Sequence, residues 1–455
     1  MQAVLNFIDN NREKYLQELK NFLKIESISS DPEKKSEMDR CADFIKEKFS
    51  ELGLDKIQTL NRDGFQIVYA EKIIDHNKPT ILFYGHYDVQ PVDPIDLWKS
   101  PPFSGEIRDG KIWARGATDD KGQLLTHLKS VEAFLSTSTE LPVNVKFVIE
   151  GEEEIGSPSL GKTIAAHKDL LACDAVVISD TSMYDDKTPS ITYSLRGLAY
   201  FQIGITGPNR DLHSGTFGGA VMNPIQEMCD LLSGMKDKNG KITIPGFYDD
   251  VLKLTKAERD GFKKLKFSEK AYMKVLGVKE LFGEKGFTTL ERTGARPTLE
   301  INGIWGGFTG QGAKTVLPSK AYAKISMRLV PHQTPKKIEK LLKDYLKKAV
   351  PKSVTYSVEA LHGGEPALTS IEGKAIQAAA RAMKSTFGKT PVFTREGGSI
   401  PIVVEFGRLL KAPVVLMGFG LATENLHSPN EHFDLNNFHK GIHCSAAFMN
   451  EFIKQ

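Results

Sequence analysis

The sequence predicts an α/β protein in which one domain is interrupted by another. Between residues 65 and 195, short apolar runs alternate with helical patterns, which is typical of a mostly parallel sheet with helices on both faces. The pattern changes after Ser194-Leu-Arg-Gly197, and a helix and a strand beyond residue 360 again resemble the first block. We therefore expect a discontinuous α/β domain at 1–195 and 360–455, and an inserted α+β domain at 196–359. A chain of 455 residues is also longer than one hydrophobic core usually supports.

The elements of the discontinuous domain follow from apolar periodicity. Apolar residues three or four apart predict helices, whereas short continuous apolar runs predict strands that are buried on both faces. The helices are expected at 3–24, 34–52, 122–136, 159–171 and 369–386, and the strands at 79–85, 143–149, 174–179, 191–195 and 414–417.

The inserted domain has fewer and longer elements. Strands are expected at 198–206, 298–304, 322–330 and 353–359, and helices at 223–235, within the lysine-rich stretch 251–285, and after residue 334. The last helix has a clear start, because Thr334 is a good N-cap residue and Pro335 suits the first helical position. The lysines of this domain are expected to lie on solvated helix faces.

Charge and cysteine content exclude several classes of protein. The 60 basic and 57 acidic residues give a net charge of +3, which lacks the concentrated basic surface of a nucleic-acid-binding protein. The four cysteines are scattered and form no Cys-x-x-Cys pair, so a zinc ribbon, a redox pair or a disulfide framework is not expected.

The location is expected to be cytoplasmic. Reduced thiols fit a cytosol, and residues 1–10 lack the basic and apolar regions of a signal peptide. The longest apolar stretch, at 412–422, is too short to span a bilayer, so we expect no membrane partner.

Histidine and acidic residues recur at the ends of the predicted strands. His86 and Asp88 close one apolar run, Glu152-Glu-Glu154 follows a second, and Asp180 ends a third. Asp119 lies in a glycine-flanked turn just before a helical pattern. Because ligands bind at the carboxyl ends of the strands in open α/β sheets, this recurrence predicts a metal site at that edge.

The chemistry of these residues supports the same interpretation. A strand-end imidazole such as His86 can ligate a metal, while a carboxylate such as Asp88 holds its other ring nitrogen. Crowded glutamates are unfavourable unless a cation neutralises them, although a solvated acidic loop is the simpler alternative. Adjacent glutamates also allow one to ligate while the next handles the proton of a water molecule.

A competing motif points to a nucleotide hydrolase. Gly156-Ser-Pro-Ser-Leu-Gly-Lys-Thr163 matches the phosphate-loop pattern, but Glu150 to Ile155 separate it from its strand and would repel phosphate. Pro158 also lacks the N–H that such a loop uses to hold oxygens. We keep this function as a remote alternative. The sequence has no G-x-S-x-G elbow and no H-E-x-x-H helix.

Taken in order, the motifs resemble those of the aminoacylase/carboxypeptidase-G/carnosinase group of co-catalytic metallopeptidases, most closely its cytosolic non-specific dipeptidase branch. The resemblance spans nearly the whole chain. It rests on 85–91 (GHYDVQP), Trp98 with 101–103 (PPF), 115–122 (RGATDDKG), 150–157 (EGEEEIGS), 178–180 (ISD), 211–215 (DLHSG), 312–318 (GAKTVLP), 326–331 (SMRLVP), 395–399 (REGGS) and 427–431 (HSPNE).

This resemblance implies two zinc ions bridged by Asp119 and a water molecule. His86 and Asp180 would hold one ion, and Glu154 and His427 the other. Mn²⁺ or Co²⁺ could replace zinc.

The resemblance also assigns the residues around the metals. Glu153 would be the general base and Asp88 the residue that orients His86. Glu152 falls at a variable position of the family and adds a charge. The family usually has a cis peptide bond after the bridging aspartate, here between Asp119 and Asp120.

The residues implied in substrate binding are His213, Thr315, Arg328 and Ser399. The inserted domain would be a lid and dimerisation domain, and His213 and Thr315 would act from the partner subunit of a homodimer. Arg328 would clamp a terminal carboxylate, although a structural ion pair is the alternative. The substrate would be a small peptide or an N-acyl amino acid, since dipeptidases and N-acyl-amino-acid deacylases share this metal core.

Overall fold

The computed structural model describes the chain except for residues 62, 399 and 455, and it divides into two compact units. The first unit comprises Met1–Tyr193, Thr369–Thr394 and Ile402–Gln455, and the second comprises Ser194–Leu368 and Arg395–Pro401. The sequence placed the domain boundaries at 195/196 and 359/360. The units instead change at 193/194 and 368/369, and the short segment 395–401 joins the second unit.

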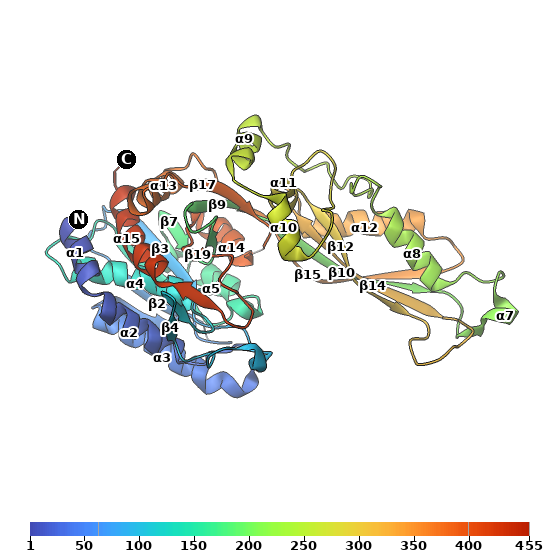
Figure 1. The fold of residues 1–455 in the computed structure, drawn as a ribbon, viewed down its shortest axis with the longest axis horizontal. Helices are drawn as coiled ribbons and strands as arrows, with labels where there is room; N and C mark the ends of the chain where they lie inside the picture. Colours follow the sequence, from blue (N-terminus) through green and yellow to red (C-terminus); the bar gives the residue numbers. More distant parts are fainter. Residues whose placement is uncertain (62, 399, 455) are drawn as a thin grey trace. The chain divides into compact units, whose positions relative to one another are not determined.

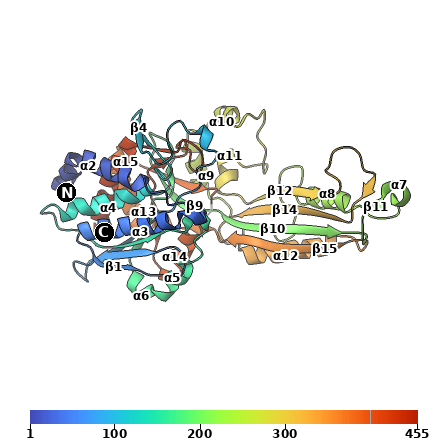
Figure 2. The same cartoon turned by 90° about the horizontal axis from the view of Figure 1, so that it is seen from below.

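The first unit is built around a large sheet (Figures 1 and 2). Its helices are α1 (Gln2–Asn10), α2 (Arg12–Leu23), η1 (Pro32–Lys34), α3 (Lys35–Glu51), η2 (Ile95–Leu97), α4 (Lys121–Leu135), η3 (Glu153–Ile155), α5 (Leu160–Ala166), α6 (Lys168–Leu171), α13 (Lys374–Phe387), α14 (Pro401–Leu410) and α15 (Leu435–Phe452). Its strands are β1 (Asp55–Thr59), β2 (Val68–Lys72), β3 (Thr80–His86), β4 (Glu106–Arg108), β5 (Lys111–Trp113), β6 (Asn144–Glu150), β7 (Ala175–Ile178), β8 (Ser182–Met183), β9 (Ser190–Leu195), β17 (Val392–Glu396), β18 (Val414–Leu416), β19 (Gly420–Leu421) and β20 (His432–Asp434).

The centre of this sheet is parallel. Its strand order is β1-β2-β6-β3-β7-β18-β9, in which β6, β3, β7 and β18 run parallel, while β2 and β9 pair antiparallel at the flanks. The parallel strands are apolar on both faces because helices cover both, and every residue of β6 is buried. The parallel α/β domain predicted from the sequence is therefore confirmed.

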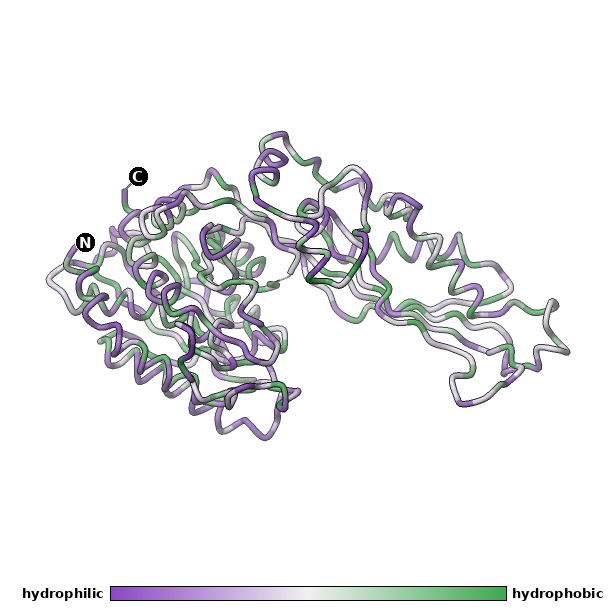
Figure 3. Tube along the Cα trace, viewed as in Figure 1, coloured by the Kyte–Doolittle hydropathy of each residue, from purple (hydrophilic) through white to green (hydrophobic). Residues whose placement is uncertain are grey.

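One face of the sheet carries most of the helices. The apolar faces of α1, α2, α3, α4, α13 and α15 share one core with Phe83 and Phe147 of the sheet. On the opposite face, Tyr84 packs against Phe406 of α14 with ring centroids 5.3 Å apart. The outer helices alternate between hydrophilic and hydrophobic residues along the tube in Figure 3, which is the pattern of helices with one buried face.

The second unit is a four-stranded antiparallel sheet with helices. Its elements are β10 (Gly197–Thr206), β11 (Leu212–His213), α7 (Ser214–Phe217), α8 (Pro224–Gly234), α9 (Lys256–Lys264), α10 (Glu269–Leu276), α11 (Thr289–Gly294), β12 (Thr298–Gly306), β13 (Val316–Leu317), β14 (Lys320–Leu329), α12 (Pro335–Ala349), β15 (Thr355–Gly364) and β16 (Ala367–Leu368). The order β12-β14-β10-β15 leaves β12 and β15 as edge strands. Alternate residues of β10 and β14 share a core with α8 and α12, so this sheet is buried on one face.

Several elements differ from those expected. The helix expected at 3–24 is interrupted at Asn11, and the helix expected at 159–171 is interrupted at His167. The sequence did not predict α14 or the β1–β2 pair. Among the residues that the structure describes, no helix is both long and apolar enough to cross a membrane.

Candidate metal centre

The site begins at the end of β3, where the strand places His86 in the buried interior. The imidazole is fully buried, and its Nε2 lies 3.1 Å from Oδ1 of Asp119. Its Nδ1 lies 3.1 Å from the backbone oxygen of Asp88 and 3.4 Å from the Asp88 carboxylate. These acceptors on Nδ1 leave Nε2 directed at Asp119, which is the orientation a metal ligand needs.

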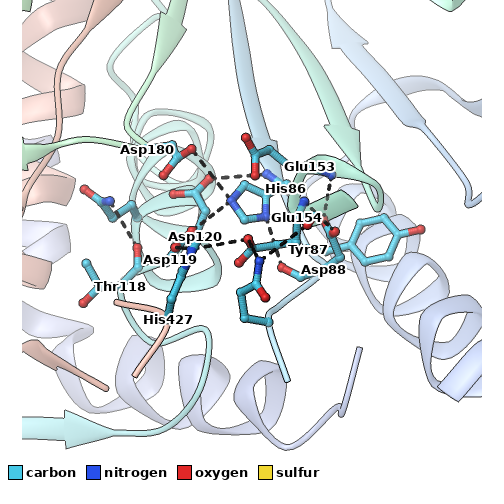
Figure 4. A network of polar contacts seen from close by, with 12 residues as sticks. His86, Tyr87, Asp88, Thr118, Asp119, Asp120, Glu153, Glu154, Asp180 and His427 are labelled. Carbon is cyan, nitrogen blue, oxygen red and sulfur yellow. Dashed lines mark hydrogen bonds and ion pairs between the residues drawn. The ribbon is translucent and has the colours of Figure 1, made fainter. Parts of the chain in front are cut away.

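Asp119 occupies the turn before α4 and lies between two imidazoles (Figure 4). Its Oδ1 faces His86, and its Oδ2 is 2.9 Å from Nε2 of His427. The peptide bond between Asp119 and Asp120 is cis, as the resemblance implied. The backbone N–H of Asp119 donates to Glu431 at 3.2 Å, so the turn is fixed by a buried carboxylate.

Asp88 connects His86 to the two glutamates. Its Oδ1 accepts the backbone N–H of Glu153 at 3.2 Å, and its Oδ2 accepts that of Glu154 at 3.0 Å. These are N–H groups of the short helix η3, so the Asp88 carboxylate caps it. One buried side chain thus orients the imidazole and holds the segment that carries both glutamates.

The predicted ligands form two adjacent triads that share Asp119. His86, Asp119 and Asp180 form one triad, and Asp119, Glu154 and His427 form the other. In each triad the potential ligand atoms lie within 4.8 Å of one another. The two triads differ in burial, because the His86 side chain is fully buried whereas that of His427 is 55% exposed.

The carboxyl groups of the site have strongly perturbed pKa values. Burial, followed by the charge of Asp119, raises the pKa of Glu154 to about 9. Burial also raises the pKa of Glu153 well above its usual range, and the charges of Asp180 and Glu154 add to the effect. Burial alone would raise the pKa of Asp119, but hydrogen bonds with His427 and His86 hold it well below its usual range.

The raised pKa values of Glu153 and Glu154 indicate an excess of buried negative charge, which a bound cation would neutralise. Like charges at short range are unfavourable in a poorly solvated site, and a metal ion is the usual compensation. Imidazole nitrogens and carboxylate oxygens are also the donors that zinc accepts. Both the charge balance and the donor set therefore fit metal ions in the two triads.

The buried supports of the site were not predicted from the sequence. Glu431 accepts the N–H groups of Thr118 and Asp119 and pairs with Arg115 at 2.7 Å, although these partners lie more than 300 residues away in the chain. Gln90 donates to Oε2 of Glu154 at 2.7 Å. Arg115 and Glu431 lie inside motifs that the sequence singled out, but nothing in the sequence indicates that they pair.

The phosphate-loop motif has a different role in the structure. Glu152, which is 2% exposed, accepts the backbone N–H of Ser159 at 3.1 Å and that of Phe65 at 2.9 Å. The N–H of Leu160 donates to the Ser157 oxygen. N–H groups of this loop are thus already used within the protein, which argues against a phosphate site.

Three of the proposed substrate residues, His213, Thr315 and Arg328, lie in the second unit. His213 and Thr315 are brought together, with Nε2 3.5 Å from the threonine hydroxyl, and both are exposed. Arg328 lies on β14 opposite Leu198 of β10. Ser399 lies outside the described residues.

Carboxylate and imidazole triads at the carboxyl edge of a parallel sheet are typical of metal-dependent hydrolases. Residues 82–451 match peptidase family M20/M25/M40. The chain is 34% identical over 466 residues to the Cys-Gly metallodipeptidase of Schizosaccharomyces pombe, covering 99% of this chain and 98% of that protein. It is 34% identical over 469 residues to the human Beta-Ala-His dipeptidase, covering 99% of this chain and 92% of the relative.

A solved structure shows the same similarity. The M20 family metallo-carboxypeptidase of Sulfolobus solfataricus matches with a TM-score of 0.83 at 34% identity, covering 96% of this chain and 99% of that one. The chain belongs to peptidase family M20/M25/M40, and the resemblance drawn from its motifs is confirmed. The protein is therefore an enzyme of a metallopeptidase family.

Proposed function

We propose that this enzyme cleaves the amide bond of dipeptides, or of other small peptides with a free C-terminal carboxylate. The observation that carries the proposal is the pair of triads that share Asp119, with Glu153 close to both. Relatives named as dipeptidases match along nearly the whole chain, which supports this substrate class.

The proposed cofactor is zinc, at two ions per chain. His86, Asp119 and Asp180 would hold one ion. Asp119, Glu154 and His427 would hold the other. Mn²⁺ and Co²⁺ suit the same donors. When bound, such ions polarise a scissile carbonyl group and make a water molecule more acidic.

Glu153 is proposed as the general base. Its carboxyl group takes the proton of the attacking water and passes it to the leaving amine. The burial of Glu153 and its place next to Glu154 of the second triad favour this role, because a general base must lie beside the water that it deprotonates. Asp88 keeps the base in position through the Glu153 backbone.

The substrate-binding residues are proposed from the matched motifs. Arg328 and Ser399 would recognise the C-terminal carboxylate of the substrate, and the planar guanidinium of Arg328 suits a bidentate contact. His213 and Thr315 would contact the substrate from the partner subunit of a homodimer, with His213 donating to the developing oxyanion. The short distance between these two side chains agrees with a common role.

A cytoplasmic location is also proposed. All four cysteines, Cys41, Cys173, Cys229 and Cys444, are free, and Cys229 is exposed. Exposed free thiols persist in a reducing compartment.

A substrate panel tests the proposal. Protein reconstituted with Zn²⁺ is assayed with free dipeptides, with their C-terminal amides, and with N-acetyl amino acids. We expect kcat/KM to be highest for the free dipeptides. A preference for N-acetyl amino acids would favour an N-acyl-amino-acid deacylase on the same site, and hydrolysis of ATP alone would favour the phosphate-loop alternative.

A further inference from the structure

The loop that carries His427 has an unfavourable backbone. Asn425, His427 and Asn430 all have positive φ angles, of 59°, 58° and 63°. Residues with a Cβ atom rarely adopt this left-handed conformation, although asparagine tolerates it best. The loop therefore needs contacts that hold it in place, because the His427 side chain is more than half exposed.

The two ends of this loop meet at Glu424 and His432. The backbone N–H of His432 donates to the Glu424 oxygen at 3.1 Å, which closes the loop. Both ends of the loop also contact the Thr118 side chain. The hydroxyl of Thr118 lies 3.0 Å from Oε2 of Glu424 and 2.7 Å from the backbone oxygen of His432. Thr118 is fully buried and directly precedes Asp119 (Figure 4).

The hydrogen atoms at this junction can be counted. The Thr118 hydroxyl carries one hydrogen, but both of its neighbours are acceptors when Glu424 is ionised. The hydroxyl can therefore donate to Oε2 of Glu424 or to the His432 oxygen, and either bond ties Thr118 to one end of the loop. Burial raises the pKa of Glu424 to about 7, against the lowering effect of its hydrogen bonds with Asp434, Leu421 and Thr118. The carboxyl also accepts the backbone N–H groups of Leu421 and Asp434.

We propose that Thr118 is a positioning residue that joins the His427 loop to Asp119, through its hydroxyl contacts with Glu424 and His432. The inference rests on the proposed function, because it concerns the affinity of the His427 triad for its metal ion. The other triad shares Asp119, but its two remaining ligands, His86 and Asp180, lie outside this loop. Loss of the Thr118 hydroxyl should therefore weaken the binding of the ion at His427 much more than the binding of the other ion.

The test is a stepwise Zn²⁺ titration of metal-stripped protein against a chromophoric chelator. His427→Ala identifies the binding step that belongs to the His427 triad. Thr118→Val keeps the shape of the side chain and the N–H bond to Glu431, and should weaken that step about 10–100-fold, the range for residues that support a ligand. The other step should change less than about threefold. Thr118→Ser keeps the hydroxyl and should restore both steps.

A second variant acts on the same loop without touching the core. Asn430 donates to the Leu97 oxygen and accepts the Lys99 N–H, each at 2.8 Å, and these bonds fasten the outer side of the loop. Asn430→Gly removes them while tolerating the positive φ. It should also weaken the His427 step selectively, which tests whether the position of the loop sets this affinity. If Thr118→Val does not fold, Thr118→Ala is titrated in its place.

Three outcomes would overturn the inference. These are equal weakening of both steps by Thr118→Val, no weakening of the His427 step by Thr118→Val, or failure of Thr118→Ser to restore that step. A general loss of protein stability would weaken both Zn²⁺-binding steps alike, so the ratio between the two steps distinguishes it from a positioning role of Thr118. A wild-type protein that binds fewer than two ions would instead contradict the proposed function itself.

Discussion

The two adjacent glutamates should give opposite phenotypes when each is replaced by glutamine. The Glu153 side chain is assigned proton transfer, and its backbone N–H keeps the bond to Asp88 in the variant. Glu153→Gln should therefore retain zinc but lose about 10²–10⁴-fold in kcat, which corresponds to about 3–5 kcal/mol of transition-state stabilisation.

Glu154→Gln should affect metal binding first. Its Oε2 lies 3.3 Å from Nε2 of His427, within the second triad. Even residues that only support a ligand change metal affinity by about 10–100-fold, so loss of a ligand charge should exceed that range. The assay measures kcat and KM at saturating Zn²⁺, together with zinc content after gel filtration. Loss of zinc in Glu153→Gln with retention in Glu154→Gln would refute the assignment.

Three further predictions concern the substrate, the dimer and the fold. Arg328→Met should remove the preference for free dipeptides over their C-terminal amides, measured as the ratio of kcat/KM values; an unchanged ratio excludes the clamp. Mixed and reassociated chains of His213→Ala and Glu153→Ala should regain up to about a quarter of wild-type activity, because random heterodimers contain one intact site. A mixture that stays inactive despite forming heterodimers would place His213 outside a shared site. Arg115→Met leaves Glu431 buried without its partner and should lower the free energy of unfolding by about 3–5 kcal/mol in urea denaturation, whereas a change below about 1 kcal/mol would show that the pair contributes little.

The sequence predicted those parts of the centre that depend on local order along the chain. His86 and Asp180 each follow an apolar run, and neighbouring parallel strands present their carboxyl ends at the same edge of a sheet. Their placement in one triad therefore follows from strand order. The cis peptide bond after Asp119 agrees with the family resemblance, although composition and periodicity alone give no sign of it.

The contacts that hold the centre together were not visible in the sequence. Arg115 and Glu431 pair across 316 positions, and Thr118 contacts Glu424 across 306. Such pairs depend on how distant loops pack, and nothing in the local pattern distinguishes these carboxylates from solvated ones. Asp88 was expected to orient His86, but its two bonds to the η3 backbone emerge only from the folded geometry.

The single helix predicted at 3–24 was wrong for a local reason. The apolar pattern at 3–24 continues through Asn11, which ends α1 by donating from its backbone N–H to Phe7 and Ile8 and then precedes α2. The apolar periodicity does not reveal this break, because both helices bury residues in the same core and the apolar pattern continues across it.

The most direct test of the account is the dependence of dipeptide hydrolysis on bound zinc. Protein stripped with a chelator is reconstituted to known zinc contents and assayed with a free dipeptide. The two triads predict that the stripped protein is inactive and that activity reaches its maximum as zinc approaches two ions per chain. Full activity in the stripped protein, or a maximum at one ion per chain with no further binding, would contradict the shared-Asp119 centre.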